Sequence, residues 1–187
     1  MSKRDRKKQL VSWFIILVMI SGVFGFVFSF IGNPGSNTAN VQYNGITLSY
    51  EDGLYTTELQ GQDVFFYYDP FIIESVNTPE GFDTALRSGT ARFTIDQNDT
   101  QVGLLTSMFF EVQEIVPASF AYTTDARVPA VTCENATQTN PVFYAKSAQE
   151  FSVNLTNNCY ILNIAQQGDA GFARDRMLYG YFGVING

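Results

Sequence analysis

An uncharged apolar run from Leu10 to Ile31 constrains this chain more than any other feature of its sequence. The run has 22 residues, of which only three serines are polar. As an α-helix at about 1.5 Å per residue it spans roughly 33 Å, enough to cross a hydrocarbon core about 30 Å thick. A cleavable secretory signal has a shorter apolar part, about 7 to 15 residues, and ends at small residues, whereas this run ends in bulky side chains. Since a core helix of this length is also uncommon directly behind a charged N-terminus, we predict a retained transmembrane helix over residues 10–32.

The flanks of the run predict its orientation. Five basic residues precede it, and the first basic residue after it is Arg87. Because cytoplasmic flanks carry the excess of Lys and Arg, the N-terminus is expected in the cytoplasm. The chain then divides into a cytoplasmic basic tail (1–9), the transmembrane helix (10–32), a linker (33–40) and an extracytoplasmic domain (41–187). The predicted location is the cell membrane, with a single pass.

The charge of the chain is unevenly distributed. The formal net charge is −7, but the first eight residues contribute +4, so that the remainder carries −11. Such an acidic surface repels nucleic acid and anionic headgroups, which bind clustered Lys and Arg. We therefore expect no nucleic-acid partner. The expected partners are the lipid bilayer and a protein or glycan of the cell envelope.

The first part of the exported domain is typical of a β-meander, because turn-forming segments separate its short β-rich runs. These segments are Asn44-Gly45, Asp52-Gly53 and residues 60–63. Residues 46–50 alternate apolar and polar side chains, which indicates one solvated face. Residues 64–68, VFFYY, are apolar throughout and predict a central strand covered on both faces.

Helix signals follow the meander. Thr78-Pro79-Glu80 offers a capping hydroxyl, a proline for the first helical position and an acid for the first turn. Apolar residues then recur at intervals of three and four from Val102 to Val116, which predicts a second helix that Pro117 ends. A third helix is expected over residues 170–185, with an apolar face formed by Ala173, Met177, Tyr181 and Val184.

Further strands are expected at 91–95, near 128–132, and at 142–146, 151–155 and 159–164. The predicted fold class is therefore α+β: one N-terminal transmembrane helix, followed by a mostly antiparallel sheet with about three helices packed against it.

The two cysteines of the chain, Cys133 and Cys159, both lie in the predicted exported domain. An even number of cysteines in an oxidising space predicts a disulfide. The chain has no histidine, so a zinc site would need carboxylates to complete it, and neither a metal nor a cofactor is expected.

The absence of histidine also excludes Ser-His-Asp and Cys-His catalysis. A carboxylate pair, as in glycoside hydrolysis, or a Ser-Lys dyad built on Lys146 and Ser147 would remain open to an enzyme. Glu111 and Glu114 lie three residues apart on one predicted helix face, a spacing that more often marks the solvated side of a helix. The sequence thus assigns no catalytic residue, and it favours a binding or assembly module over an enzyme.

Three segments match the acceptor pattern for N-linked glycans, Asn-x-Ser/Thr. Their acceptor residues are Asn98, Asn135 and Asn154. All three are expected in loops or turns on the exported side.

The segments VPAVTCENATQTNPVFYAK, FSVNLTNNCYILNI and ARDRMLYGYFGV resemble the C-terminal pattern of uncharacterised single-pass membrane proteins of archaea. The NGI, DG and FFYYDP segments are similar to the N-terminal part of the same group. The resemblance covers nearly the whole chain and implies an anchored exported domain, with no assigned activity and no catalytic residues to carry over.

The sequence therefore predicts a membrane-anchored, extracytoplasmic, non-catalytic module for binding or cell-envelope assembly. One alternative is a type IV pilin-like filament subunit, although the small residue before the cleavage point and the early acid of the helix are missing. Another is an exported carboxylate-dependent hydrolase.

The apolar run also has a face of small residues. Ser21, Gly25 and Ser29 recur every four residues, and small side chains at this spacing let two transmembrane helices approach closely. These residues are candidates for a helix–helix contact, so that a homo-oligomer through the transmembrane helix is a further hypothesis.

Overall fold

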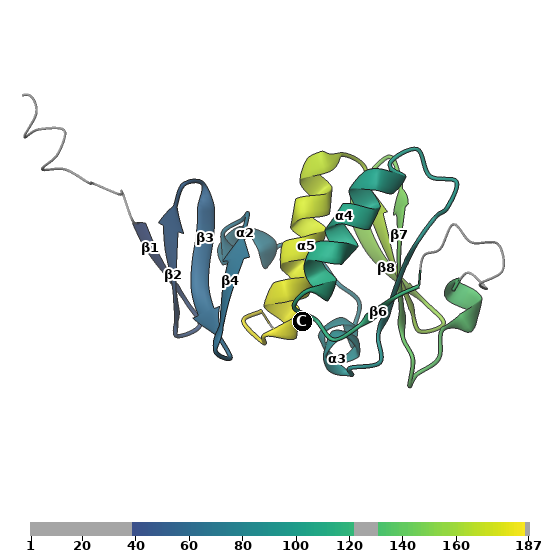
Figure 1. Ribbon diagram of the computed structural model, residues 1–187, viewed down its shortest axis with the longest axis horizontal. Helices are drawn as coiled ribbons and strands as arrows, with labels where there is room; N and C mark the ends of the chain where they lie inside the picture. The colour runs from purple at the N-terminus through teal and green to yellow at the C-terminus, as the bar shows by residue number, and fades with distance from the viewer. Residues whose placement is uncertain (1–38, 122–130, 186–187) are drawn as a thin grey trace, which may run out of the picture. The chain divides into compact units, whose positions relative to one another are not determined.

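The structure is a computed structural model, and it describes residues 39–121 and 131–185. The predicted basic tail and transmembrane helix, the linker up to residue 38, and Ser21, Gly25 and Ser29 lie outside these ranges. Among the residues that the structure describes, no helix is long and apolar enough to cross a membrane. Residues 39–121 and 131–185 belong to one compact unit, whose elements carry the labels of Figure 1.

The predicted meander is confirmed as a four-stranded antiparallel sheet. Its strands are β1 (Ala39–Tyr43), β2 (Ile46–Glu51), β3 (Leu54–Leu59) and β4 (Gln62–Phe66), paired in chain order. Asn44 and Gly45 join β1 to β2 with φ of 47° and 81°, the positive values that a tight hairpin requires.

The expectation of a central strand at residues 64–68 is wrong. β4 is an edge strand of its sheet, and its side chains alternate between the two faces. Val64 and Phe66 are buried, whereas Phe65 is 38% exposed and Tyr67, just beyond the strand, is 39% exposed. Phe65 and Tyr67 are aromatic because their exposed rings contact the guanidinium of Arg174.

A second sheet has the order β6-β5-β7-β9-β8. Its strands are β5 (Arg92–Ile95), β6 (Ser119–Phe120), β7 (Val142–Ser147), β8 (Ser152–Thr156) and β9 (Cys159–Ile164). β5 runs parallel to β6 and β7, and β7 runs parallel to β9, so that only β8 and β9 pair antiparallel. The α+β class is thus confirmed, but the mostly antiparallel arrangement holds for the first sheet alone. A crossover helix between β5 and β6 makes their parallel pairing feasible. Of the strand expected near 128–132, residues 131 and 132 are not in a strand, and the rest lies outside the described ranges.

The helices of the described ranges are α2 (Pro70–Ile73), α3 (Phe82–Arg87), α4 (Val102–Gln113) and α5 (Gln167–Tyr181). The sequence predicted α3, α4 and α5, although the observed first and last residues of these helices differ from the predicted ones. The sequence reading missed α2, although Asp69 caps it through a 2.8 Å bond from the Phe71 amide and a proline begins it. The helix start expected at Thr78 is also wrong, because α3 begins at Phe82 and the Thr78 hydroxyl accepts a bond from Arg176 instead.

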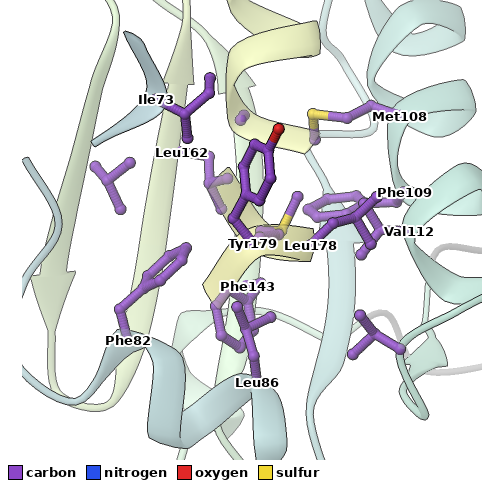
Figure 2. Packing of buried hydrophobic residues seen from close by; sticks show 14 of the residues in the cluster. Ile73, Phe82, Leu86, Met108, Phe109, Val112, Phe143, Leu162, Leu178 and Tyr179 are labelled. Carbon is purple, nitrogen blue, oxygen red and sulfur yellow. The ribbon is translucent and has the colours of Figure 1, made fainter. Parts of the chain in front are cut away.

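The core lies where α4 and α5, side by side in Figure 1, meet both sheets. Figure 2 labels Leu178 and Tyr179 of α5, and Phe109 and Val112 of α4, among the buried side chains of this core. Phe109 stacks on Phe93 of β5 with ring centroids 4.8 Å apart, and Tyr179 stacks on Phe66 of β4 at 3.8 Å. Burial of each such side chain contributes about 1.5 to 3 kcal/mol. Through these stacked rings α4 contacts the second sheet and α5 contacts the first.

α5 is buried around most of its circumference. Ala173 and Met177 are buried as expected, Tyr181 is half-buried, and Val184 is buried beyond the end of the helix. Three consecutive charged residues, Arg174, Asp175 and Arg176, are also buried. Charged groups are rarely this inaccessible to solvent unless they are paired. The partners of these three residues lie in β4, in the chain that follows it and in α3.

Candidate functional site

A concave site, here called the α4–α5 cleft, opens between the two long helices beside the end of β4. Its volume is about 460 Å³. Its lining residues are Tyr67 and Tyr68 after β4, Leu104, Ser107, Met108 and Glu111 of α4, and Gln167, Gly168, Ala170, Gly171 and Arg174 of α5.

The tyrosine wall of the cleft is fixed by Asp175. One carboxylate oxygen of Asp175 accepts bonds from the backbone amides of Tyr67 at 2.7 Å and Tyr68 at 2.8 Å. Tyr179 adds a third attachment, because its hydroxyl donates to the Tyr68 carbonyl at 3.0 Å. The chain leaving β4 is thereby held against α5.

Gly171 lets the ring of Tyr68 lie directly on α5. A Cβ atom at position 171 would meet Tyr68 Cε2 at 2.9 Å, closer than real side chains approach. The Tyr68 ring also stacks on Phe172 with a centroid distance of 4.0 Å, and its hydroxyl donates to the Gly168 carbonyl at 3.3 Å. This tyrosine is therefore a rigid, flat wall of the cleft.

Arg174 lines the cleft, and its side chain contacts aromatic rings, a backbone carbonyl and two carboxylates. Its guanidinium carbon lies 4.2 Å from the ring centre of Phe65 and 4.7 Å from that of Tyr67, so two exposed rings enclose the cation. Its Nη1 donates to the Phe65 carbonyl at 3.0 Å and to Asp175 at 2.6 Å. The arginine contact explains why β4 carries aromatic residues on its outer face as well.

Glu111 is the carboxylate of the cleft. Its Oε2 lies 2.7 Å from Arg174 Nε and accepts a 3.0 Å bond from the Tyr67 hydroxyl. Burial, and then the bond to Glu111, raise the pKa of Tyr67, so its hydroxyl stays a donor at neutral pH. The cleft thus combines flat apolar walls with a small polar edge formed by Glu111, Tyr67, Ser107 and Gln167.

Loss of solvent has the largest effect on the pKa of Asp175, the buried carboxylate that holds the tyrosine wall of the cleft. Burial raises the pKa of Asp175 from 3.8 to about 6, against the opposing effects of Arg174 and the two tyrosine amides. Next to it, Arg176 donates to Asp83 at 2.7 Å and to the Thr78 hydroxyl at 2.8 Å, an ion pair that joins α3 to α5.

The structure separates the two acids that the sequence placed on one helix face. Glu111 faces the cleft, whereas Glu114 is exposed at the end of α4 and does not line the cleft. Within the described ranges, Glu111 is the only carboxylate that lines the cleft. A pair of carboxylates about 5 to 10 Å apart, as glycoside hydrolysis requires, is therefore not assembled by these two residues.

The Ser-Lys alternative receives no support from the geometry. Ser147 donates its hydroxyl and its amide to the carboxylate of Asp99. Lys146 and Ser147 are also adjacent in β7, so their side chains point to opposite faces of the sheet.

The disulfide between Cys133 and Cys159 is present, as predicted, with the two Cα atoms 5.2 Å apart. It joins a short 3₁₀ helix (Cys133–Asn135) to the start of β9.

The three glycan acceptor residues are all exposed, although one is not in a loop. Asn98 lies in a turn after β5, and Asn135 ends the 3₁₀ helix, where its side chain accepts a bond from the Thr132 amide at 2.8 Å. Asn154 lies inside β8, so the expectation of a loop or turn is wrong for this residue.

The sequence reading missed the residues that build the cleft, namely Tyr67, Tyr68, Gly171 and Arg174. A signal was present in residues 167–176, QGDAGFARDR, where glycines and charges interrupt the apolar face of a helix. In the parts of the chain that the structure describes, no cluster of three or more potential ligands could hold a metal ion.

Comparisons with known proteins add no relative to this description: no protein-family model, no curated protein and no solved structure matches the chain.

Proposed function

We propose that this protein is a membrane-anchored extracytoplasmic module that binds a component of the cell envelope without catalysis, and that the α4–α5 cleft is its binding site. The anchor rests on the sequence alone, through the apolar run of residues 10–32 and the basic residues that precede it.

The observation that carries the proposal is the construction of the cleft. Ligand sites are typically concave, about 300 to 1,000 Å³ in volume, and mostly apolar, with a few oriented polar groups. The α4–α5 cleft, at about 460 Å³, has flat aromatic and aliphatic walls with Glu111, Ser107 and Gln167 among its lining residues. Its size fits one sugar residue of a glycan or one or two side chains of a protein.

The charge pairing supports binding over hydrolysis. A general acid or base needs a carboxylate that is free to accept or release a proton. Glu111 is held by Arg174 and the Tyr67 hydroxyl on the same oxygen, an arrangement that orients it as a hydrogen-bond acceptor. The carboxylate-dependent hydrolase is therefore the less favoured alternative.

The disulfide supports the compartment. Bonds of this kind persist mainly in oxidising spaces, and Cys133 and Cys159 are bonded within one chain. The type IV pilin-like alternative depends on residues 1–38, which lie outside the described ranges, and it stays a prediction.

Topology is tested by adding protease to sealed right-side-out vesicles that contain the full chain. We expect digestion of residues 41–187 and protection of the N-terminal tail. Full protection of the C-terminal domain would refute the proposed orientation.

The cleft is tested by affinity purification of the full chain from its native membranes, followed by identification of bound proteins and glycans. Ser107→Trp places a large ring into the cleft from an exposed position of α4, whereas Gly103→Trp places the same ring on α4 outside the lining residues. We expect Ser107→Trp to lose the partner and Gly103→Trp to retain it. Equal recovery of the partner with both variants would show that binding does not use the cleft.

A further inference from the structure

β8 is an edge strand with an unusual composition. Within the described ranges it pairs with β9 alone, so its other side has no strand partner. Residues 151–156, FSVNLT, contain no charge and no proline, the features by which proteins normally prevent edge strands from pairing with other chains. Asn154, Leu155 and Thr156 are all exposed.

A groove of mixed polar and apolar lining adjoins β8. A cavity of about 430 Å³ lies between β8 and the segment that begins with α2, and its lining includes Ile72, Val76, Phe151 and Phe172. Ile72 is 50% exposed, and Leu155 of β8 is 44% exposed. The open strand and the groove together make a surface that is prone to associate with a strand of another molecule.

Asn154 lies in the middle of this surface, with its acceptor motif presented in an extended form. Side chains two residues apart in a strand lie on the same face, so Asn154 and Thr156 point to the same side of β8. Asn154 also borders the groove. Its Nδ2 donates a 3.2 Å bond to the Ser152 hydroxyl, an exposed contact that is easily exchanged for water.

We propose that Asn154 carries an N-linked glycan in the exported protein, and that this glycan shields the open edge of β8 and the adjoining groove from association with other chains. The inference rests on the proposed export of the domain, because glycans of this kind are transferred on that side of the membrane.

The transfer reaction uses a lipid-linked oligosaccharide as the glycosyl donor. A bond forms between Asn154 Nδ2 and the anomeric carbon of the first sugar. The bond between that carbon and the phosphate oxygen of the lipid breaks, and the lipid phosphate leaves with the bonding electrons. The amide nitrogen loses one proton to a base of the transferase.

A glycan at this position performs the task that a lysine or proline performs at other sheet edges. It is bulky and hydrated, so a second strand that approached β8 would have to displace it. Since Asn154 is exposed on β8, we expect the modification to leave the fold unchanged.

Occupancy is tested by mass spectrometry of glycopeptides from the full chain purified from its native membranes, with alkylation of free thiols in the same sample. We expect a glycan on Asn154 and bonded Cys133 and Cys159. An unmodified Asn154 together with a formed disulfide would overturn this inference while leaving the proposed export intact. An unmodified Asn154 together with two free thiols would overturn both.

Shielding is tested by comparing the association state of three variants by light scattering in detergent solution. Asn154→Gln and Thr156→Val each remove the acceptor motif, and Asn98→Gln removes a different one as the matched control. We expect the first two variants to associate increasingly with concentration, and the control to behave as the unaltered protein does.

A rescue variant separates edge pairing from other causes of association. Leu155→Lys places a charge on the exposed edge, so the double variant Asn154→Gln with Leu155→Lys is expected to return to the association state of the unaltered protein. Association that persists in the double variant, or an Asn154→Gln variant that does not associate, would overturn the shielding role.

Discussion

Gly180 of α5 is the position where a single methyl group should be most damaging. A Cβ atom there would lie 2.6 Å from Arg176 Nη1 and 2.9 Å from Asp83 Cγ, and closer still to a carboxylate oxygen of Asp83. All of these atoms belong to the ion pair that joins α3 to α5, and both side chains are buried, at 5% and 2% exposure. Gly180→Ala therefore forces the pair apart in a place without water to solvate the separated charges.

The magnitude follows from two opposing effects. Breaking a buried ion pair typically lowers the free energy of unfolding by about 3 to 5 kcal/mol. Replacing glycine by alanine in a helix raises it by at most about 1 kcal/mol. We expect a net loss of about 2 to 4 kcal/mol for Gly180→Ala.

Gly103 of α4 provides the matched control, because it is exposed and a Cβ atom there would meet no atom within 4 Å. We expect Gly103→Ala to be neutral or to stabilise by up to about 1 kcal/mol. The assay is denaturant unfolding of the full chain in detergent, followed by the near-ultraviolet circular dichroism of its tyrosines. Equal midpoints for the two variants would refute the reasoning, since only one of them faces an ion pair.

Three further predictions concern the same measurement. The native pKa of Asp175, about 6, lies above its ordinary value of 3.8, so the native state binds the proton more tightly than the unfolded state does. Protonation of Asp175 therefore stabilises the fold. The stabilisation is complete below pH 4 and is lost as the pH rises through 6, by about 3 kcal/mol in total. The neutral variant Asp175→Asn should remove that slope, and a slope of unchanged size would contradict the assignment. Replacing both Cys133 and Cys159 by serine opens a loop with a sequence separation of 26 and should lower the free energy of unfolding by about 3.5 kcal/mol on the chain-entropy model, whereas an unchanged denaturation midpoint would count against it. Phe109→Ala should lower the free energy of unfolding by about 3 to 5 kcal/mol, because Phe109 is fully buried. The neighbouring variant Phe110→Ala should change this free energy by less than about 1 kcal/mol, because Phe110 is 52% exposed. Similar losses in both variants would show that the buried face of the helix is wrongly assigned.

Local patterns were sufficient where the structure depends on neighbouring residues. The hairpins of the first sheet follow from Asn44-Gly45 and Asp52-Gly53, whose backbones adopt the positive φ that these residues tolerate. The apolar spacing in α4 identified Leu105, Phe109 and Val112, all of which are buried. The disulfide followed from the number of cysteines and the predicted compartment, because the chain has no other cysteine with which either could pair.

The order of the second sheet could not be read from the sequence. A strand of four to six residues has the same alternation whether its neighbour is parallel or antiparallel, and the neighbours of β5, namely β6 and β7, are separated from it by α4 and by residues 121–141. The edge position of β4 was hidden for a different reason. Its outer rings enclose Arg174, more than 100 residues later in the chain, and the sequence gives no sign of such a contact.

The sequence by itself was sufficient to identify three features of this protein. These are an apolar run long enough to cross a membrane, an acidic domain with two cysteines that can pair and no histidine, and turns at defined positions. Only the tertiary structure decided that the buried charges of α5 attach it to the first sheet and to α3, and that Glu111 faces a cleft while Glu114 faces solvent. The physical reason is that turns and helix faces depend on residues within a few positions of each other. The pairing of buried charges depends instead on which distant groups arrive at the same place, because an ion loses its water there and must find its partner within the fold.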